Sequence, residues 1–199
     1  MEIVNLRKGG LAIYGGVIAG ILTLLVFTKK RHLSFLSMAD SACLGLITGQ
    51  MIGRWGNFIN CEAFGRYTDC LFAMRIRRSI VNESMISQNL IDHLILDNGI
   101  EYIQVHPTFL YESLWNFGLL MFMFWFRKRK TFTGEMLCIY LAGYGIGRAW
   151  IEGLRTDSLL IPGTQIAVSQ ALSVVLATVS LVILIYNRRK ACVQGKEAN

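Results

Sequence analysis

The chain has 199 residues, of which 53% are apolar and only 17% are charged. Soluble domains carry about a quarter charged residues, so this composition argues against a soluble cytosolic enzyme and for a chain embedded in lipid. The formal net charge of +7 could suit nucleic acid, but the basic residues cluster at the ends of apolar segments, which excludes that partner. At about 20 residues per crossing, the length allows about five spans and one outer loop.

Five apolar segments are predicted to cross the membrane as helices of a single domain, residues 1–199. They are residues 9–28, 36–58, 108–126, 134–154 and 165–186. The first segment is too long, and too firmly ended by three basic residues, for a cleaved signal peptide. The second is the weakest, because several polar side chains interrupt it.

Basic residues set the predicted orientation, because they are retained on the cytoplasmic side of short loops. Three clusters, at residues 29–31, 127–130 and 188–196, hold 11 of the 20 basic residues and fall on one side when five spans are threaded. The C-terminus is then cytoplasmic and the N-terminus outside, although Arg7 and Lys8 oppose this placement of the first helix.

Residues 60–107 form the long outer loop, and we expect them to fold as a small α+β cap. Alternating apolar and polar residues at 72–77 and 102–105 resemble short strands, with a polar stretch of helical character between them. Asp97-Asn98-Gly99 predicts a turn before the second strand. Cys61 and Cys70 also lie here and are candidates for a disulfide. The predicted fold class is thus an all-α polytopic membrane protein with about five transmembrane helices and a small α+β cap on its outer face.

The fourth span carries charged groups that need partners. An ionisable side chain at a helix centre costs about 2.5 to 3.5 kcal/mol, so Arg148 and Glu152 must lie near the outer interface or face other helices. Tyr144, Arg148 and Glu152 share one helix face at a spacing of four residues, and Arg155 follows on nearly the same face. The alternative interpretation is an interfacial ion pair with a snorkelling arginine.

The second span ends in a similar polar group. Arg54 and Asn57 lie at its outer end, and Arg54 is at the same predicted depth as Arg148. Two convergent guanidinium groups in a low-dielectric site would suit a phosphate, because their planar forks match its oxygens. Glycines at 45, 49 and 53 of the same span form a ridge that predicts close helix packing.

The third span begins with His106-Pro107 on the outer side. His106 is a candidate proton carrier near neutral pH, or else a structural hydrogen-bonding group. Glu112 lies one turn deeper and needs a partner. No spacing of histidine, cysteine or carboxylate residues indicates a metal site, and no glycine-rich loop indicates a nucleotide cofactor.

Taken together, these segments resemble the prolipoprotein diacylglyceryl transferase family of bacterial membrane enzymes. The likeness is carried by residues 10–16, 53–60 with Glu62 and Gly65, 106–112, and 144–155. The resemblance implies transfer of a diacylglyceryl group from phosphatidylglycerol to the lipobox cysteine of a preprolipoprotein, with no cofactor. It also implies a multi-pass protein of the bacterial plasma membrane whose active site faces the outer leaflet. Family members have seven spans, so we expect a short form lacking the first two.

The resemblance also implies roles for individual residues. Arg148 is expected to be the principal clamp of the lipid phosphate, with Arg54 as the second clamp and His106 as the surviving base. Tyr14 stands where family members place a histidine, so the usual base is replaced or absent. The remaining expected site residues, which orient or bind, are Asn57, Glu62, Gly65, Tyr144, Glu152 and Arg155.

Two other functions fit parts of the pattern. Intramembrane arginine and glutamate pairs also mark the pathways of lipid or organic-anion transporters, but those need polar groups through the whole membrane depth. Here they cluster at the outer end. A truncated, inactive paralogue that binds lipid without turnover is the other alternative, suggested by Tyr14 and the short length.

Overall fold

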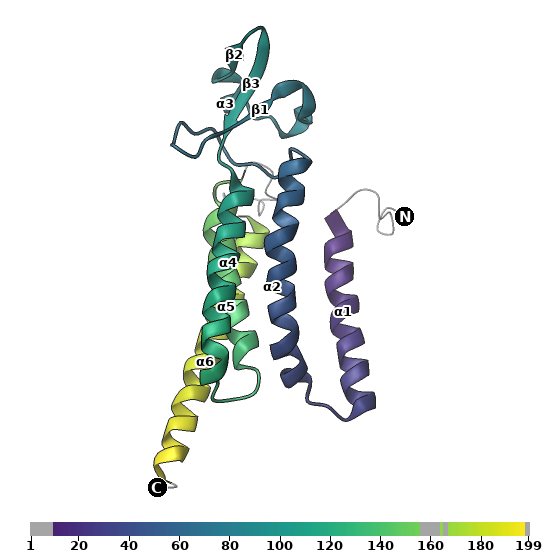
Figure 1. Ribbon diagram of the computed structural model, residues 1–199, viewed down its shortest axis with the longest axis vertical. Coiled ribbons are helices and arrows are strands. Elements are labelled where there is room, and N and C mark those ends of the chain that lie inside the picture. The colour runs from purple at the N-terminus through teal and green to yellow at the C-terminus, as the bar shows by residue number, and fades with distance from the viewer. Residues whose placement is uncertain (1–9, 156–163, 165–166, 198–199) are drawn as a thin grey trace.

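The structure, a computed structural model, describes residues 10–155, 164 and 167–197 and is mostly helical (Figure 1). Its long helices are α1 (Gly10–Arg31), α2 (Phe35–Ile59), α4 (Thr108–Phe126), α5 (Glu135–Glu152) and α6 (Val168–Glu197). Each predicted apolar segment therefore coincides with a long helix. The last helix continues past the predicted end at Tyr186, because the polar tail contains no proline to stop it.

Three helices of the described part are long and apolar enough to cross a membrane. They are Phe35–Ile59, Thr108–Arg129 and Val168–Ala191. Helix α5 is not among them, and its 18 residues include three charged side chains, Glu135, Arg148 and Glu152. The side chains of residues 10–14, at the start of α1, lie outside the described part. Five crossings therefore remain a prediction.

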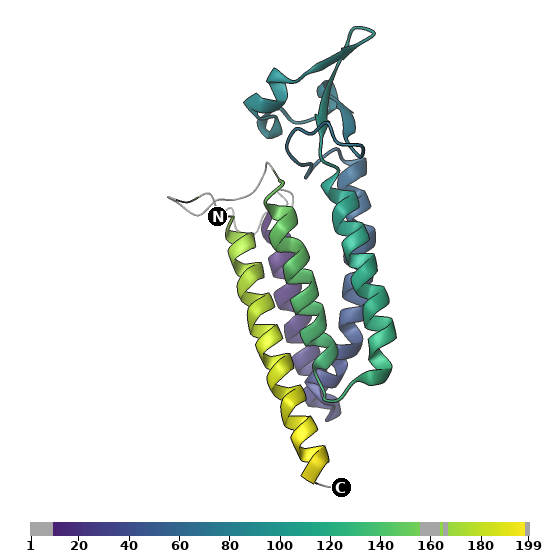
Figure 2. The same cartoon turned by 90° about the vertical axis from the view of Figure 1, so that its left-hand side faces the viewer.

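The long helices run side by side, with α2, α4 and α5 in mutual contact, α6 against α5 and α1 against α2 (Figures 1 and 2). Cys43 and Ile47 of α2 pack in one buried cluster with Met123 of α4 and Met136 of α5. The residues of α2 at positions 45, 49 and 53 point away from these neighbours. A Cβ added there would meet no described atom within 4 Å, so the prediction of helix packing on that glycine ridge is wrong for the described chain.

The start of α5 is held by a side chain of α2. Asp40 is 5% exposed and accepts hydrogen bonds from the backbone nitrogens of Gly134, at 2.8 Å, and Leu137, at 2.9 Å. Lys130 Nζ lies 2.7 Å from the same carboxylate. Gly134 has a φ of +94°, a conformation that glycine adopts without a steric penalty. Asp40 thereby fixes α5 against α2, and with it the register of Arg148 relative to Arg54.

The cap contains a three-stranded antiparallel sheet in the order β1-β3-β2. The predicted strands are confirmed as β1 (Met74–Arg77) and β3 (Ile100–Val105), while β2 (Ile95–Asp97), which forms a hairpin with β3, was not expected. Short helical pieces connect β1 to β2. They are η2 (Arg78–Ile80), η3 (Glu83–Met85) and α3 (Gln88–Asp92).

The cap has a core of its own, separate from that of the helices. It consists of Phe64, Ile76, Val81, Leu90, Ile103 and Val105. Cys61 and Cys70 are both free thiols, so the candidate disulfide is not formed. The boundary between the cap core and the helix core lies at the ends of α2, α4 and α5 nearest the cap, where the charged residues Arg54, Glu112 and Arg148 meet.

Candidate active site

Glu112 of α4 lies between two arginines that come from two other helices. Its Oε2 atom is 2.6 Å from Nε of Arg54 in α2, and its Oε1 atom is 3.0 Å from Nη1 of Arg148 in α5. Glu112 is only 5% exposed. A buried carboxylate is costly unless it is paired, so the two guanidinium groups compensate it while it holds them together. The predicted convergence of Arg54 and Arg148 is therefore observed, with a carboxylate at its centre.

A second carboxylate holds Arg148 from its own helix. Nη2 of Arg148 is 2.5 Å from Oε2 of Glu152, one turn further along α5. Oε1 of Glu152 accepts a hydrogen bond of 2.7 Å from the hydroxyl of Ser169, which ties the cluster to α6. Arg155 approaches Oε1 of Glu112 at 3.9 Å. Arg148 is thus clamped between two carboxylates in a fixed orientation.

Arg54 is held less tightly than Arg148. Within the described part of the chain, its guanidinium group contacts one acceptor, Glu112, through Nε. Its two terminal nitrogens are therefore available to a further acceptor, and the side chain is 19% exposed. The neighbouring Trp55 is anchored by a 3.2 Å hydrogen bond from Nε1 to the hydroxyl of Ser113. This bond joins α2 to α4 at the depth of the Arg54–Glu112 pair and so keeps Arg54 in place.

His106 lies at the rim of the cluster, just before α4. Its Nδ1 is 3.2 Å from the hydroxyl of Tyr111, and that hydroxyl is 3.9 Å from Sγ of Cys70 in the cap. Burial lowers the pKa of His106 from its ordinary value of 6.5, which keeps the imidazole neutral at pH 7. A neutral imidazole can accept a proton, so His106 has the protonation state that a base requires.

Gly65 connects the cap to His106 on one side and to Arg155, at the end of α5, on the other. Its backbone nitrogen donates to the carbonyl of His106 at 3.0 Å, and it forms an antiparallel bridge with Arg155. A Cβ at this position would lie 2.7 Å from Cβ of His106 and 3.1 Å from the carbonyl oxygen of Leu154. Only glycine permits this approach, so the backbone at Gly65 fixes His106 relative to the end of α5.

The other predicted site residues are not brought into the arginine cluster. Glu62 accepts a 3.2 Å hydrogen bond from Asn60 on the surface, and its backbone nitrogen donates to the carbonyl of Asn57. Tyr144 stacks on Tyr140 with ring centroids 5.9 Å apart. The side chain of Tyr14 lies outside the described part of the chain, so its predicted role is not addressed.

Glu112 was not among the site residues expected from the sequence. A carboxylate in an apolar span signals a buried partner, and arginines were expected at the same depth on two other spans. That signal could have joined Glu112 to Arg54 and Arg148. What the one-dimensional pattern lacked was the rotation of α4 about its axis, which decides whether Glu112 faces the other helices or lipid.

The arrangement is suited to binding an anion. Two guanidinium groups are fixed at the ends of the helices nearest the cap, between the core of the cap and the core of the bundle. Guanidinium forks bind phosphate or carboxylate oxygens through paired hydrogen bonds, and a partly dry environment strengthens that attraction. A neutral histidine lies at the rim. The site can therefore stabilise a negative charge and accept a proton close by.

A family model and individual relatives both place this chain in one protein family. The sequence model of prolipoprotein diacylglyceryl transferase matches residues 1–186. Proteins named phosphatidylglycerol–prolipoprotein diacylglyceryl transferase from Bacillus cereus and Bacillus thuringiensis are 40% identical to this chain over 188 residues, and one from Bacillus mycoides is 39% identical. Each alignment covers 94% of this chain and 64% of the relative. The chain thus spans just under two thirds of the length of these relatives.

Proposed function

Because the chain belongs to the prolipoprotein diacylglyceryl transferase family, we propose that it transfers the diacylglyceryl group of phosphatidylglycerol to the lipobox cysteine of a preprolipoprotein. The observation that carries this proposal is the pair of arginines, Arg54 and Arg148, held on one buried carboxylate at the outer ends of three helices. It supplies the phosphate-binding group that the reaction needs, at the depth where a lipid headgroup lies.

The reaction balances with the groups at hand. The cysteine sulfur attacks the glycerol carbon that bears the phosphate ester, a carbon–sulfur bond forms, and the carbon–oxygen bond to the phosphate breaks. Glycerol phosphate leaves as an anion, and the thiol proton passes to a base. The negative charge grows on the leaving phosphate, so fixed cations beside it lower the barrier.

Arg54 and Arg148 divide this task. Arg148 is locked between Glu112 and Glu152, so it supplies a pre-oriented positive charge at little reorganisation cost. Arg54 has its terminal nitrogens available and supplies the fork that grips the phosphate oxygens. Arg155 approaches Glu112, and Gly65 positions His106, so both orient these groups. Asn57, Glu62 and Tyr144 lie outside the arginine cluster and are proposed to bind other parts of the substrate.

His106 is the proposed base for the lipobox thiol. Its lowered pKa keeps it neutral, and its hydrogen bond with Tyr111 orients the ring. Tyr14, at the position of the family's histidine, is a poor base with an ordinary pKa of about 10 and is assigned a supporting role near the substrate.

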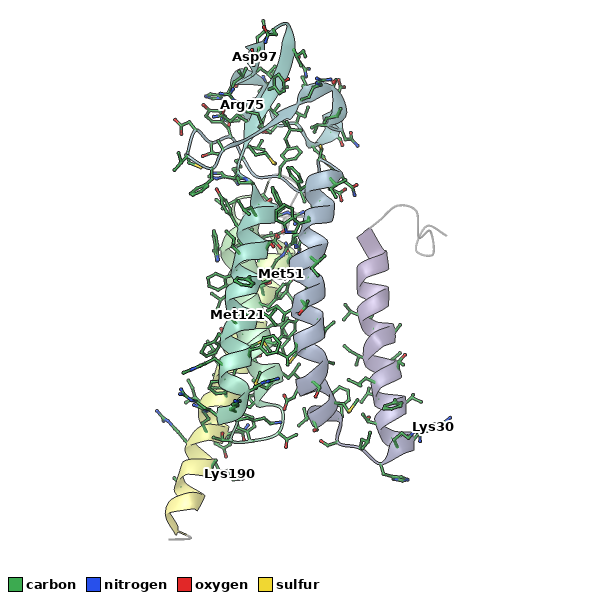
Figure 3. All side chains as sticks on the ribbon, in the orientation of Figure 1. Lys30, Met51, Arg75, Asp97, Met121 and Lys190 are labelled. Atoms are coloured by element: carbon green, nitrogen blue, oxygen red, sulfur yellow. The ribbon has the colours of Figure 1, made fainter. Side chains whose placement is uncertain are left out.

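We further propose a multi-pass placement in the bacterial plasma membrane, with the site towards the outer leaflet. Lys30 and Lys190 lie at the same end of the molecule, opposite Arg75 and Asp97 of the cap (Figure 3). The basic cluster of residues 127–130 follows α4 at that same end. Basic residues are retained in the cytoplasm, so this end, including the C-terminus, faces the cytoplasm and the cap faces outward.

The test is a transfer assay with the protein in vesicles of phosphatidylglycerol and a lipobox peptide. We expect glycerol phosphate release and a peptide heavier by one diacylglyceryl group, with turnover reduced about a hundredfold or more in Arg148→Ala. The matched control is Arg78→Ala, which removes an arginine of the cap surface that pairs with Glu101. Lipid binding without peptide modification, beside a working full-length relative, would contradict the proposal and favour an inactive lipid-binding protein.

A further inference from the structure

A tight turn at the base of the cap carries apolar residues at its two corners. The backbone nitrogen of Ala73 donates to the carbonyl of Cys70 at 2.8 Å, which places Leu71 and Phe72 at the central positions of the turn. Leu71 is 93% exposed and Phe72 is 63% exposed. Turn corners usually carry glycine, proline, asparagine, aspartate or serine, because these residues fit the backbone angles of the turn or hydrogen-bond to its backbone. Two large apolar side chains at these positions bury little surface within the described chain.

The depth of this turn is set by a contact with α4. Sγ of Cys70 is 3.9 Å from the hydroxyl of Tyr111, which lies in the first turn of that apolar helix. The ring of Tyr111 stacks on Trp150 of α5, with centroids 6.3 Å apart, and Trp150 is 46% exposed. Tyrosine and tryptophan gather where the membrane meets water. The turn therefore lies level with an interfacial aromatic pair.

We propose that the turn of residues 70–73 inserts Leu71 and Phe72 into the outer leaflet of the membrane. The partner is the lipid surface itself, because the turn sits beside the outer end of a helix long enough to cross the bilayer. Asp69, directly before the turn, is exposed, and an ionisable side chain is costly to place in the hydrocarbon, which limits insertion to the two corner residues. The inference rests on the proposed membrane placement but not on the proposed reaction.

Insertion of this turn has a consequence for the site. Cys70 contacts Tyr111, and Tyr111 is hydrogen-bonded to His106, so the anchored turn and the proposed base share one side chain. The anchor holds the base of the cap down on the lipid surface. It thereby keeps the rim of the site at the level from which a phospholipid headgroup must enter.

The cap offers a matched control for this proposal. Leu96 of β2 is also an exposed leucine, at 71%, but it lies next to Asp97 at the far tip of the hairpin (Figure 3). Hydrophobic exposure alone would therefore treat Leu96 and Phe72 alike. Membrane insertion requires that they differ, because only Phe72 lies at the level of the helix ends.

The experiment adds one tryptophan at each position, Phe72→Trp or Leu96→Trp, to protein reconstituted in phosphatidylglycerol vesicles. The fluorescence of the added tryptophan is obtained by subtracting the emission of the wild-type protein. We expect brominated lipids to quench most of the Phe72→Trp signal and aqueous iodide to quench little of it. The Leu96→Trp signal should show the reverse. Equal quenching of both variants by iodide, with no effect of brominated lipid on Phe72→Trp, would overturn the proposal.

A second measurement separates anchoring from catalysis. The double variant Leu71→Ser and Phe72→Ser should unfold at the wild-type temperature in detergent, since both side chains are exposed there. Its transfer rate should fall on phosphatidylglycerol in vesicles but not on short-chain phosphatidylglycerol in detergent, with Leu96→Ser unchanged in both. An equal loss in detergent would argue against a membrane anchor. If no variant and no wild-type protein transfers lipid, the proposed function fails, while the quenching result still decides the anchor.

Discussion

Glu112 determines whether the two arginines can face each other at all. Two guanidinium groups held close together repel each other strongly where little water surrounds them. The carboxylate of Glu112 forms a salt bridge with each of them and so makes their approach favourable. In the proposed reaction Glu112 is therefore a positioning residue, since it acts on the substrate through Arg54 and Arg148. The same bonds leave the terminal nitrogens of Arg54 available, so positioning does not consume the group that the ligand needs.

Replacing this carboxylate with its neutral amide tests that role. Glu112→Gln should lower the free energy of unfolding by about 3 kcal/mol, because two partly buried arginines lose the buried counter-charge that they share. Thermal unfolding in detergent measures the change, and the transfer rate should fall with it. Glu101→Gln is the control, because Glu101 forms an exposed pair with Arg78 worth about 1 kcal/mol or less. Equal effects of the two substitutions would show that Glu112 is not the centre of the cluster.

The pH dependence of the proposed transfer tests the assignment of His106 as the base. Its pKa is lowered by burial, so the neutral form is the stable one at pH 7 and the base is lost only as the pH falls through a value below 6.5. Below that value the rate should drop about tenfold per pH unit. His106→Gln should be slow and lack this acid limb, while His93→Gln in the cap should keep it. An unchanged profile in His106→Gln would exclude His106 as the base.

At the scale of elements, the site depends on how closely the segments approach. The segment that begins at Gly65 runs between His106 and the end of α5, with backbone hydrogen bonds to both sides. The chain then continues into the sheet of the cap. The close contact of the Gly65 segment with His106 and the end of α5 therefore sets the position of the cap over the site. A side chain at Gly65 would force the segment, the histidine or the end of α5 to move.

Gly65→Ala tests this close passage. The added methyl group would lie 2.7 Å from Cβ of His106, so we expect a loss of about 1–3 kcal/mol in unfolding free energy and a lower transfer rate. Gly49→Ala is the control, since no described atom lies within 4 Å of its added Cβ. In a helix interior that change should be neutral or stabilising by up to about 1 kcal/mol. Wild-type stability and activity in Gly65→Ala would contradict the packing role.

At the scale of the whole molecule, charge and polarity are arranged along one axis. Basic clusters lie at one end of the helices, the buried arginine–glutamate group lies at the other, and the cap lies beyond it (Figures 1 and 3). Between the two ends the helices pack through an apolar cluster around Met123 and Met136. Asp40 and Glu135 are buried polar groups at the end opposite the cap. The family match favours the proposed transfer over the transporter alternative.

Labelling in intact cells tests the orientation. A membrane-impermeant maleimide added outside should label Cys70, which is exposed and whose pKa is lowered by a hydrogen bond with Thr68. Cys70→Ser should lose most of that label, since Cys61, the other free thiol described in the cap, is less exposed. A cysteine introduced by Lys190→Cys should react only after the cells are permeabilised. Labelling of Lys190→Cys from outside would reverse the proposed orientation.

Several features follow from the sequence alone because they depend on local chemistry. The long apolar runs predict the long helices, and the alternation at residues 72–77 and 102–105 predicts two strands of the cap. Helical spacing places Arg148 and Glu152 one turn apart, which is the ion pair observed. The order of motifs also indicates the family that the comparisons support.

Only the tertiary structure decided which faces meet. The rotation of α4 turns Glu112 inward to Arg54 and Arg148, while the glycine ridge of α2 faces away from the packed helices. The tertiary structure also leaves Cys61 and Cys70 as separate thiols, and it places the apolar turn of residues 70–73 beside Tyr111. The physical reason is that periodicity fixes which residues share a helix face, but not which neighbour that face contacts. Those contacts depend on packing between segments far apart in the chain.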